Sequence, residues 1–267
     1  MLVTEAGPVS PKAALVDIQG TLLHADGSPL PHAGDAIAAL RAQGVAVRFV
    51  TNIDSVGVET ILGRLTHAGI SALASEVFSP ISATVRFLEL NARPRCFLLV
   101  PDTIEPEFAA FRGNGGRIDC VVVGDCREGF TYARLNEALR HVMAGAQLVA
   151  LQKGRFFPTA DGPVLDTGAF VSALEYGSGQ QAHVIGKPSA ELLRLAIADL
   201  GCDPFDAVMV GDDVASDVAG AHAIGARSVL VRTGKFTLAD LEQAERKPDL
   251  VIDSIADLPA AMSELAT

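Results

Sequence analysis

The sequence predicts an α/β protein with an open parallel sheet, and three observations support this prediction. Short apolar runs rich in β-branched residues alternate with longer amphipathic segments along the chain, which is the pattern of strands joined by helical crossovers. Several of the apolar runs end in polar residues, as strands do where they enter ligand-binding loops. The 267 residues are enough for about two domains, each with its own core.

The expected elements follow from this alternation. The runs predicted to be strands are residues 13–18, 45–51, 96–101, 119–125, 148–153, 182–186, 207–212, 228–233 and 250–254. The amphipathic segments predicted to be helices are residues 34–44, 55–69, 131–145, 189–201 and 215–225. The first of these helices should stop at Gly44, because glycine readily adopts the left-handed conformation that ends many helices.

Composition excludes several classes of protein. The net charge of −11 argues against a nucleic-acid partner, because such binding depends mainly on Lys and Arg neutralising phosphates. No apolar run is long enough to cross a membrane, and the N-terminus MLVTEAGPVSPK lacks a signal-peptide pattern, so we expect a cytoplasmic protein. The four cysteines form no C-x-x-C pair, which predicts reduced thiols rather than a zinc site or disulfides.

The stretch AALVDIQGTLL, residues 13–23, places a single carboxylate, Asp17, directly after an apolar run. A carboxylate at a strand end can act as a nucleophile or a metal ligand. It can also simply cap the turn that begins at Gly20. Gly20 allows a tight turn, and we expect the hydroxyl of Thr21 to fix the loop.

Two shorter motifs also end predicted strands. FVTN ends in Thr51 and Asn52, whose hydroxyl and amide can donate to an anion, although such a pair often only starts a turn. VIGKPS contains Lys187, which by itself is most simply a solvated lysine. Beside acidic strand ends, Lys187 would instead be a fixed positive charge that holds a phosphoryl group and a carboxylate nucleophile together.

The strongest signal is the stretch VMVGDDVASDVAGAHAIGA, residues 208–226. Asp212, Asp213 and Asp217 crowd between an apolar strand and a helix of small residues, where like charges gain little unless a cation neutralises them. Oxygen ligands without nearby His or Cys suit magnesium rather than zinc. The alternative is an acidic helix N-terminus that is stabilised by the helix dipole.

In this order, the motifs DIQGT, VTN, GKP and GDDVASD resemble those of the haloacid dehalogenase superfamily of phosphotransferases. Residues 151–193 and RTGKF are similar to the branch with a class IIA cap, which includes pyridoxal and nucleotide phosphatases and the phospholysine/phosphohistidine/pyrophosphate phosphatase group. The resemblance implies a doubly wound, Rossmann-like core of residues 1–78 and 182–267. A smaller α/β cap of residues 79–181 would be inserted between the second and third motifs.

The resemblance also implies roles for the residues around the transferred phosphoryl group. Asp17 would be the nucleophile that forms an aspartyl-phosphate. Thr51 and Asn52 would hydrogen-bond the phosphoryl oxygens. Lys187 would cancel the repulsion between the carboxylate and the phosphate, which otherwise makes a carboxylate a poor nucleophile.

The metal site is implied in the same way. The carboxylates of Asp17 and Asp212 and the backbone carbonyl of Gln19 would hold Mg²⁺. Asp213 or Asp217 would act behind these ligands or orient Lys187, and the motif leaves open which of the two does so.

Gln19 departs from the family pattern, in which a second Asp protonates the leaving alkoxide and later activates water. A glutamine amide cannot transfer that proton, and loss of a general acid or base costs on the order of 100- to 10,000-fold in rate. We therefore expect a magnesium-dependent phosphatase for a small phosphorylated metabolite that is weak on alkyl phosphate esters. Phosphoramidates, acyl phosphates and pyrophosphate should be affected least.

Two alternatives accompany this interpretation. One is a weakly active or inactive relative that binds a phosphorylated ligand or a protein partner. The other is a dehalogenase, which the GDDVASD cluster disfavours because dehalogenases of the superfamily dispense with magnesium. The resemblance alone implies a homodimer formed through the caps. Within the cap, we expect a loop of residues 161–167 and a helix from about Gly168 to close over the substrate and to determine specificity.

Overall fold

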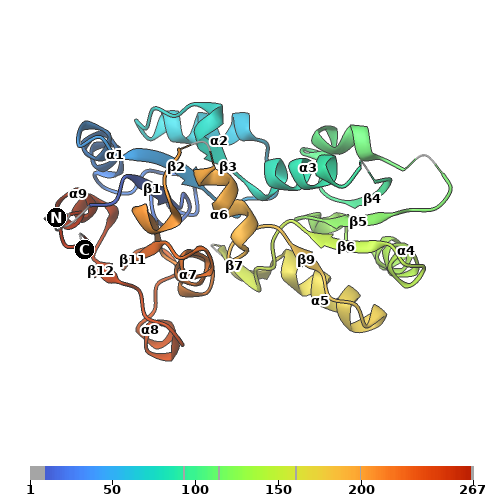
Figure 1. Ribbon diagram of the computed structural model, residues 1–267. Coiled ribbons are helices and arrows are strands. Elements are labelled where there is room, and N and C mark those ends of the chain that lie inside the picture. Colours follow the sequence, from blue (N-terminus) through green and yellow to red (C-terminus); the bar gives the residue numbers. More distant parts are fainter. Residues whose placement is uncertain (1–9, 93, 114, 160, 199, 266–267) are drawn as a thin grey trace, which may run out of the picture. The chain divides into compact units, whose positions relative to one another are not determined.

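The computed structural model describes residues 10–92, 94–113, 115–159, 161–198 and 200–265. The chain divides into two compact units (Figure 1). The first unit comprises residues 1–51, 62–78 and 187–267, and the second comprises residues 52–61 and 79–186. One limit of the units coincides with the expected boundary after residue 78, whereas 52–61 and 182–186 group with the second unit. The assignment of the units as core and cap stays a prediction.

The first unit is built on a six-stranded parallel sheet with the order β12-β11-β10-β1-β2-β3. Its strands are β1 (Ala13–Val16), β2 (Ala46–Val50), β3 (Val77–Phe78), β10 (Ala207–Gly211), β11 (Arg227–Val231) and β12 (Leu250–Ile252). All residues of β1 and β10 are buried, because the central strands of a parallel sheet are covered on both faces. Because both faces of these strands are buried, their residues form the continuous apolar runs from which the strands were predicted.

Helices surround this sheet in two groups, because the strand order runs from β1 toward β3 in one direction and from β10 toward β12 in the other. Right-handed crossovers then place the connecting helices on opposite faces. Accordingly, α1 packs on α9 whereas α6 packs on α7. The helices of this unit are α1 (Ala33–Ala42), α6 (Ala190–Ile197), α7 (Ala219–Ile224), α8 (Leu238–Gln243) and α9 (Leu258–Ala261). Helix α2 (Val58–His67) is divided between the units, since residues 58–61 group with the second and 62–67 with the first. The chain turns at Gly44, with φ of 81°, directly after α1 as predicted.

The second unit has its own four-stranded parallel sheet with the order β4-β5-β6-β9 and a separate two-stranded antiparallel sheet. Its core forms where α4 and α5 pack on the parallel sheet, with Val121, Ala138 and Val171 at its centre. The strands are β4 (Cys96–Leu99), β5 (Cys120–Val123), β6 (Gln147–Ala150), β7 (Phe156–Thr159), β8 (Gly162–Leu165) and β9 (His183–Val184). The helices are α3 (Pro80–Leu90), α4 (Tyr132–Met143) and α5 (Thr167–Ser178).

Local sequence signals fix where the helices of the second unit begin. The side chains of Ser79, Thr131 and Asp166 accept hydrogen bonds from the first backbone N–H groups of α3, α4 and α5. Such caps satisfy donors that have no partner within the helix. The helix expected from about Gly168 is α5, and it begins one residue earlier, at Thr167.

Two expectations about local structure were wrong. Residues 161–167 are not a loop, because β8 occupies most of this segment and pairs with β7. The helix expected over 215–225 begins as a π-helical turn, Val214–Val218, before α7.

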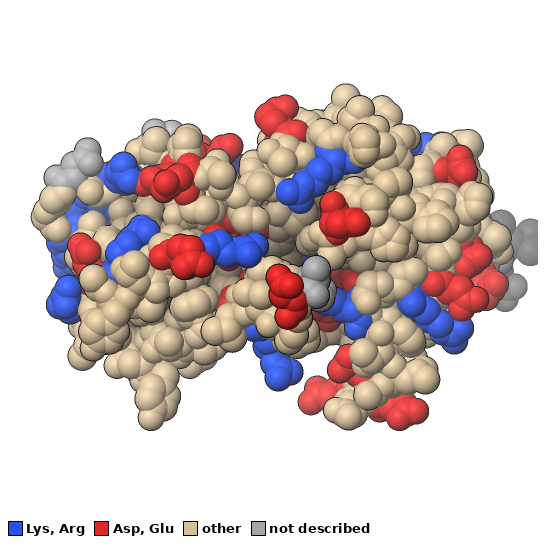
Figure 2. All heavy atoms as spheres, turned by 180° about the vertical axis from the view of Figure 1, so that it is seen from behind, with Lys and Arg blue, Asp and Glu red and all other residues tan. Residues whose placement is uncertain are grey.

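No helix among the described residues is both long and apolar enough to pass through a membrane. Residues 1–9, on which the expectation of no signal peptide depends, lie outside the described residues. On the face shown in Figure 2, acidic and basic side chains are interspersed. The expectation that the protein does not bind nucleic acid stays a prediction.

Candidate active site

The candidate site lies at the carboxyl ends of β1, β2 and β10 in the first unit. Strands β1 and β10 are neighbours, with Val16 opposite Val210, and the strand order reverses between them. Asp17 follows β1, Thr51 follows β2 and Asp212 follows β10. In open parallel sheets, the loops diverge at such a reversal and leave a crevice for ligands. The polar strand ends that the sequence singled out therefore share one edge of the sheet.

The Lys187 side chain makes hydrogen bonds to residues at these strand ends. Its Nζ donates to Asp17 Oδ1 at 2.5 Å, to Asp217 Oδ1 at 2.7 Å and to the Val50 carbonyl at 3.1 Å. The lysine is only 3% exposed, so the interpretation as a solvated side chain was wrong. Burial alone would lower the pKa of Lys187, but the charges of Asp17 and Asp217 outweigh that effect and raise it. The site thus contains a fixed positive charge.

Three buried carboxylates surround this lysine. One oxygen from each of Asp17, Asp212 and Asp217 lies within 4.8 Å of the others. Burial raises the pKa of Asp212, and the charges of Asp17 and Asp217 raise it further. Burial also raises the pKa of Asp217, against the opposing effect of Lys187. Three carboxylates and one ammonium group leave two negative charges, and a set of hard oxygen donors with this charge fits a divalent cation such as Mg²⁺.

Asp213 and Asp217 have different partners, which bears on the alternative that the sequence left open. Both oxygens of Asp217 accept hydrogen bonds, one from Lys187 and the other from the backbone N–H of Asp213 at 3.1 Å. Asp213 Oδ1 accepts from the backbone N–H groups of Ala215 and Ser216 at 2.9 and 3.3 Å. Asp217 is therefore the one of the two that contacts Lys187, whereas Asp213 caps the turn that follows β10; the role of orienting Lys187 stays a prediction.

The remaining predicted residues lie in different surroundings. Thr51 is buried and its backbone N–H donates to the Phe78 carbonyl at 3.0 Å. Asn52 groups with the second unit, so its contact with a phosphoryl group stays a prediction. The side chain of Gln19 is exposed. Thr21 is fully buried, and its hydroxyl has no hydrogen-bond partner among the described residues, so the expectation that it fixes the loop was wrong.

Sequence reasoning did not recognise the loop after β11 as part of the site. The backbone N–H of Lys235 donates to Asp212 Oδ2 at 2.6 Å, and its Nζ lies 3.4 Å from Asp213 Oδ2. The signal was the motif RTGKF, residues 232–236, which follows another strand at the same edge of the sheet.

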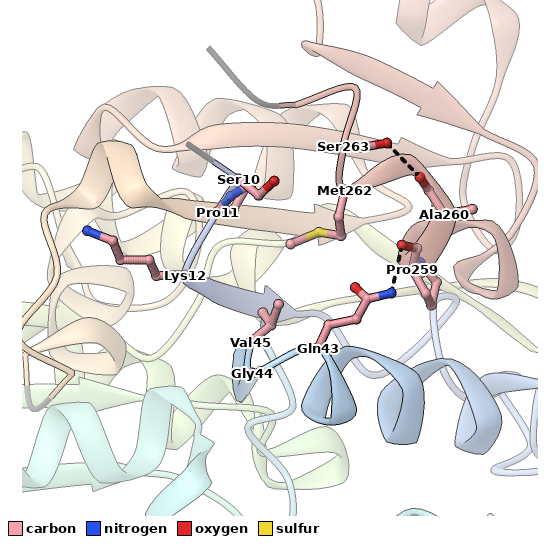
Figure 3. Close-up of a pocket in the computed structure, with 10 residues that line it drawn as sticks. All are labelled: Ser10, Pro11, Lys12, Gln43, Gly44, Val45, Pro259, Ala260, Met262 and Ser263. Atoms are coloured by element: carbon pink, nitrogen blue, oxygen red, sulfur yellow. Dashed lines mark hydrogen bonds between the residues drawn. The ribbon is translucent and has the colours of Figure 1, made fainter. Parts of the chain in front are cut away.

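A separate cavity of about 440 Å³ lies at the opposite edge of the same sheet (Figure 3). It is lined by residues that precede β1 and β2 and by residues 259–263, and three of its polar side chains already have partners. Gln43 donates to the Pro259 carbonyl, Ser263 donates to the Ala260 carbonyl, and Lys12 pairs with Asp206. This cavity contains none of the predicted site residues.

Known proteins resemble this chain in sequence and in fold. A haloacid dehalogenase-like hydrolase family model matches residues 14–112, and a HAD-hydrolase-like model matches residues 184–258. The mouse haloacid dehalogenase-like hydrolase domain-containing protein 2 is 39% identical over 243 residues, which cover 91% of this chain and 92% of that protein. This chain belongs to the haloacid dehalogenase-like hydrolases.

Other members of the family are phosphatases by name. The human phospholysine phosphohistidine inorganic pyrophosphate phosphatase is 34% identical over 252 residues, which cover 92% of each chain. The structure of a p-nitrophenyl phosphatase from Archaeoglobus fulgidus matches with a TM-score of 0.87 and 30% identity over 94% of this chain and 99% of that one. A 4-nitrophenylphosphatase from Thermotoga maritima matches with a TM-score of 0.86 and 28% identity over 94% and 97%. The doubly wound α/β fold is confirmed, and this haloacid dehalogenase-like hydrolase is a phosphatase.

Proposed function

We propose that this protein is a Mg²⁺-dependent phosphatase that acts on a small phosphorylated metabolite through an aspartyl-phosphate formed on Asp17. The observation that carries the proposal is the buried Asp17 carboxylate, which Lys187 holds at 2.5 Å inside a cluster of three carboxylates. An isolated capping Asp would need neither a buried lysine nor two further acidic groups. Such a cluster is costly to bury unless its excess charge is neutralised.

Each group then has a chemical task. A carboxylate oxygen of Asp17 attacks phosphorus, and the bond from phosphorus to the leaving group breaks. Water later hydrolyses the resulting acyl phosphate, which restores the Asp17 carboxylate and releases inorganic phosphate. Lys187 and the hydroxyl of Thr51 stabilise the negative phosphoryl oxygens, and Asn52 is proposed to add an amide donor. Mg²⁺ would be held by Asp17, Asp212 and the Gln19 carbonyl, and it would supply the charge neutralisation that lets a carboxylate approach a phosphate.

The proposed substrate class follows from Gln19. The leaving group takes the bonding electrons, and an alkoxide needs a proton that a glutamine amide cannot give. Phosphoramidates, acyl phosphates and pyrophosphate depend less on that proton. The name of the human phosphatase that is 34% identical includes phospholysine, phosphohistidine and pyrophosphate, which supports the same class here. Cytoplasmic location and a homodimer formed through residues 79–181 belong to the proposal on sequence grounds alone.

A second candidate function is favoured by Gln19 as well. A protein without the usual acid/base residue could bind a phosphorylated ligand or a protein partner with little turnover. The retained set of Asp17, Lys187 and Asp212 favours catalysis, because binding alone does not require a nucleophile beside a metal site.

The test is a screen of phosphorylated metabolites, including phosphoramidates and pyrophosphate, with Mg²⁺ and with a chelator. We expect turnover only with Mg²⁺, and we expect Asp17→Asn to abolish it because the amide cannot attack phosphorus. Circular dichroism of the variant should match the wild type. Activity of more than a few per cent in Asp17→Asn would contradict the nucleophile assignment. Phosphate-ligand binding without turnover in the wild type would favour the second candidate.

A further inference from the structure

The loop that follows β11, residues 232–236 and here called the 232–236 loop, holds Asp212 through its backbone. The N–H of Lys235 donates to Asp212 Oδ2 at 2.6 Å. Asp212 is 3% exposed, so this bond is shielded from water. Because the donor is a main-chain group, its position depends on the path of the loop rather than on the lysine side chain.

Two glycines form the walls of a narrow slot around the Asp212 carboxylate. A Cβ atom added to Gly234 would lie 1.9 Å from Asp212 Oδ2, and one added to Gly20 would lie 2.0 Å from the same oxygen. Both residues have positive φ, 60° and 89°, which glycine adopts without strain. The main chain at both glycines therefore lies so close to Asp212 Oδ2 that a side chain at either position would displace the carboxylate.

A side-chain hydrogen bond ties the two walls of this slot together. Thr233 Oγ1 donates to the Gly20 carbonyl at 2.5 Å. This bond links the loop after β11 to the loop that carries Asp17 and Gln19. A shift of either loop would move the slot and with it the carboxylate.

We propose that Thr233, Gly234 and the main chain of Lys235 form a positioning element that fixes Asp212 for a divalent cation. Binding Oδ2 to the Lys235 N–H leaves Oδ1 as the oxygen for the metal, and the two glycines leave Oδ2 the space to make that bond. The inference rests on the proposed Mg²⁺ site. Groups that orient metal ligands in this way typically change metal affinity by about 10- to 100-fold when they are altered.

The test compares two glycine variants at nearly the same backbone geometry. Gly234→Ala places a Cβ in the slot, whereas Gly201→Ala has φ of 61° with nothing within 4 Å of its added Cβ. The strain of an alanine at positive φ is therefore matched. The variants differ in the contacts of the added Cβ, which at Gly234 lies 1.9 Å from Asp212 Oδ2 and 2.6 Å from Gly20 Cα. Mg²⁺ affinity is measured by titration calorimetry without substrate, and the thermal midpoint is measured without metal.

We expect Gly234→Ala to bind Mg²⁺ at least about tenfold more weakly than the wild type and Gly201→Ala to bind within about twofold of it. Without metal, Gly201→Ala should lose only the stability that an alanine at positive φ costs, and Gly234→Ala should lose more because its Cβ also displaces Asp212 and the Gly20 main chain. Thr233→Val removes the tie between the walls and should weaken Mg²⁺ several-fold. If Gly234→Ala does not fold, the Mg²⁺ affinity of Thr233→Val alone tests the positioning role of the loop.

Wild-type Mg²⁺ affinity in either folded loop variant would overturn the positioning role and leave the proposed function standing. An equal loss in Gly201→Ala would overturn it too, because general strain would then explain the loss. Failure of the wild-type protein to bind Mg²⁺ would overturn the metal site itself and this inference with it.

Discussion

Asp54 is a buried carboxyl group of the second unit that lies among other acidic groups. It is 4% exposed, and its Oδ2 accepts a hydrogen bond from Thr167 Oγ1 at 2.8 Å. Burial raises the pKa of Asp54 to about 8, and the charges of Asp166 and Asp125 contribute to the rise. At neutral pH, Asp54 is therefore mostly protonated in the folded protein.

Replacing this residue should change how stability depends on pH. An unfolded Asp titrates near pH 4, so between about pH 4 and pH 8 the folded state binds one more proton than the unfolded state. Stability then falls as pH rises through this window, by up to about 1.4 kcal/mol per pH unit. Asp54→Asn removes this term while the amide oxygen can still accept from Thr167. Urea unfolding from pH 5 to pH 8 should show a stability difference that grows in favour of the variant. A constant difference would contradict the raised pKa.

Gln19 allows a direct test of the missing acid. Gln19→Asp should raise hydrolysis of an alkyl phosphate ester by up to the 100- to 10,000-fold typical of one positioned acid/base group. A phosphoramidate should gain much less, because its leaving group needs less protonation. Gln19→Asn, which adds no acid, is the control, and single-turnover rates on both substrates are the measurement. If Gln19→Asp binds Mg²⁺ normally but hydrolyses the alkyl ester no faster than the wild type, the glutamine at position 19 is not the cause of weak turnover.

Among the single elements, the turn after β10 contains one carboxylate that caps the turn and another that contacts the candidate site. Asp213 caps the segment Val214–Val218, and Asp217 within it binds Lys187. Only three residues thus separate a carboxylate that caps the turn from one that contacts Lys187.

This division predicts different outcomes for similar substitutions. Asp213→Ala should lower the free energy of unfolding by about 1 kcal/mol, because the cap is lost. Asp213→Asn should unfold like the wild type, because Asn caps equally well and the half-exposed Lys235 pair contributes little. Chemical denaturation is the measurement. Equal losses in the two variants would show that the charge of Asp213, not its cap, is what stabilises the turn.

The elements also show where sequence reasoning succeeded and where it failed. The strands β1, β5 and β10 were predicted because they are buried on both faces and therefore form continuous apolar runs. The β7–β8 hairpin was missed because Pro158 pairs in register with Pro163. Proline is excluded from central strands but is tolerated in a two-stranded sheet, where both strands are edges. Strand β3 is only two residues long and has no periodicity to detect.

For the whole molecule, motifs at strand ends located most of the candidate site. Asp17 and the Asp212–Asp217 cluster were found because they follow apolar strands of one parallel sheet, which brings such ends to one edge. Lys187 follows β9, a strand of the other sheet, so it was found from its motif and not from this rule. The contributions of Gly234 and the Lys235 N–H could not be found in this way. They depend on φ angles and on the approach of two loops, which no side-chain pattern encodes.

Metal binding should slow hydrogen exchange near the site more than in the rest of the molecule. Mg²⁺ that binds only the folded state stabilises it by about 2.7 kcal/mol at a concentration 100-fold above its Kd. Hydrogen exchange should therefore slow in residues 211–218 and 232–236 when Mg²⁺ replaces chelator. The amides of β5, in the core of the second unit, serve as the internal reference. Equal protection of β5 and the 232–236 loop would argue against a metal site at Asp212.

The pairing of β1 with β10 also sets an order of events on the ribosome. Ala13 is in register with Ala207, and at about 5 to 20 residues per second its partner is made on the order of ten seconds or more later. All strands of the second unit are translated within that interval. Until β10 is made, β1 can pair with β2 on one side only, and an unpaired strand edge is a template for pairing with other chains. The strand that carries Asp17 is therefore the one that a nascent chain leaves open longest, and we expect chaperones that bind extended apolar segments to contact it during synthesis.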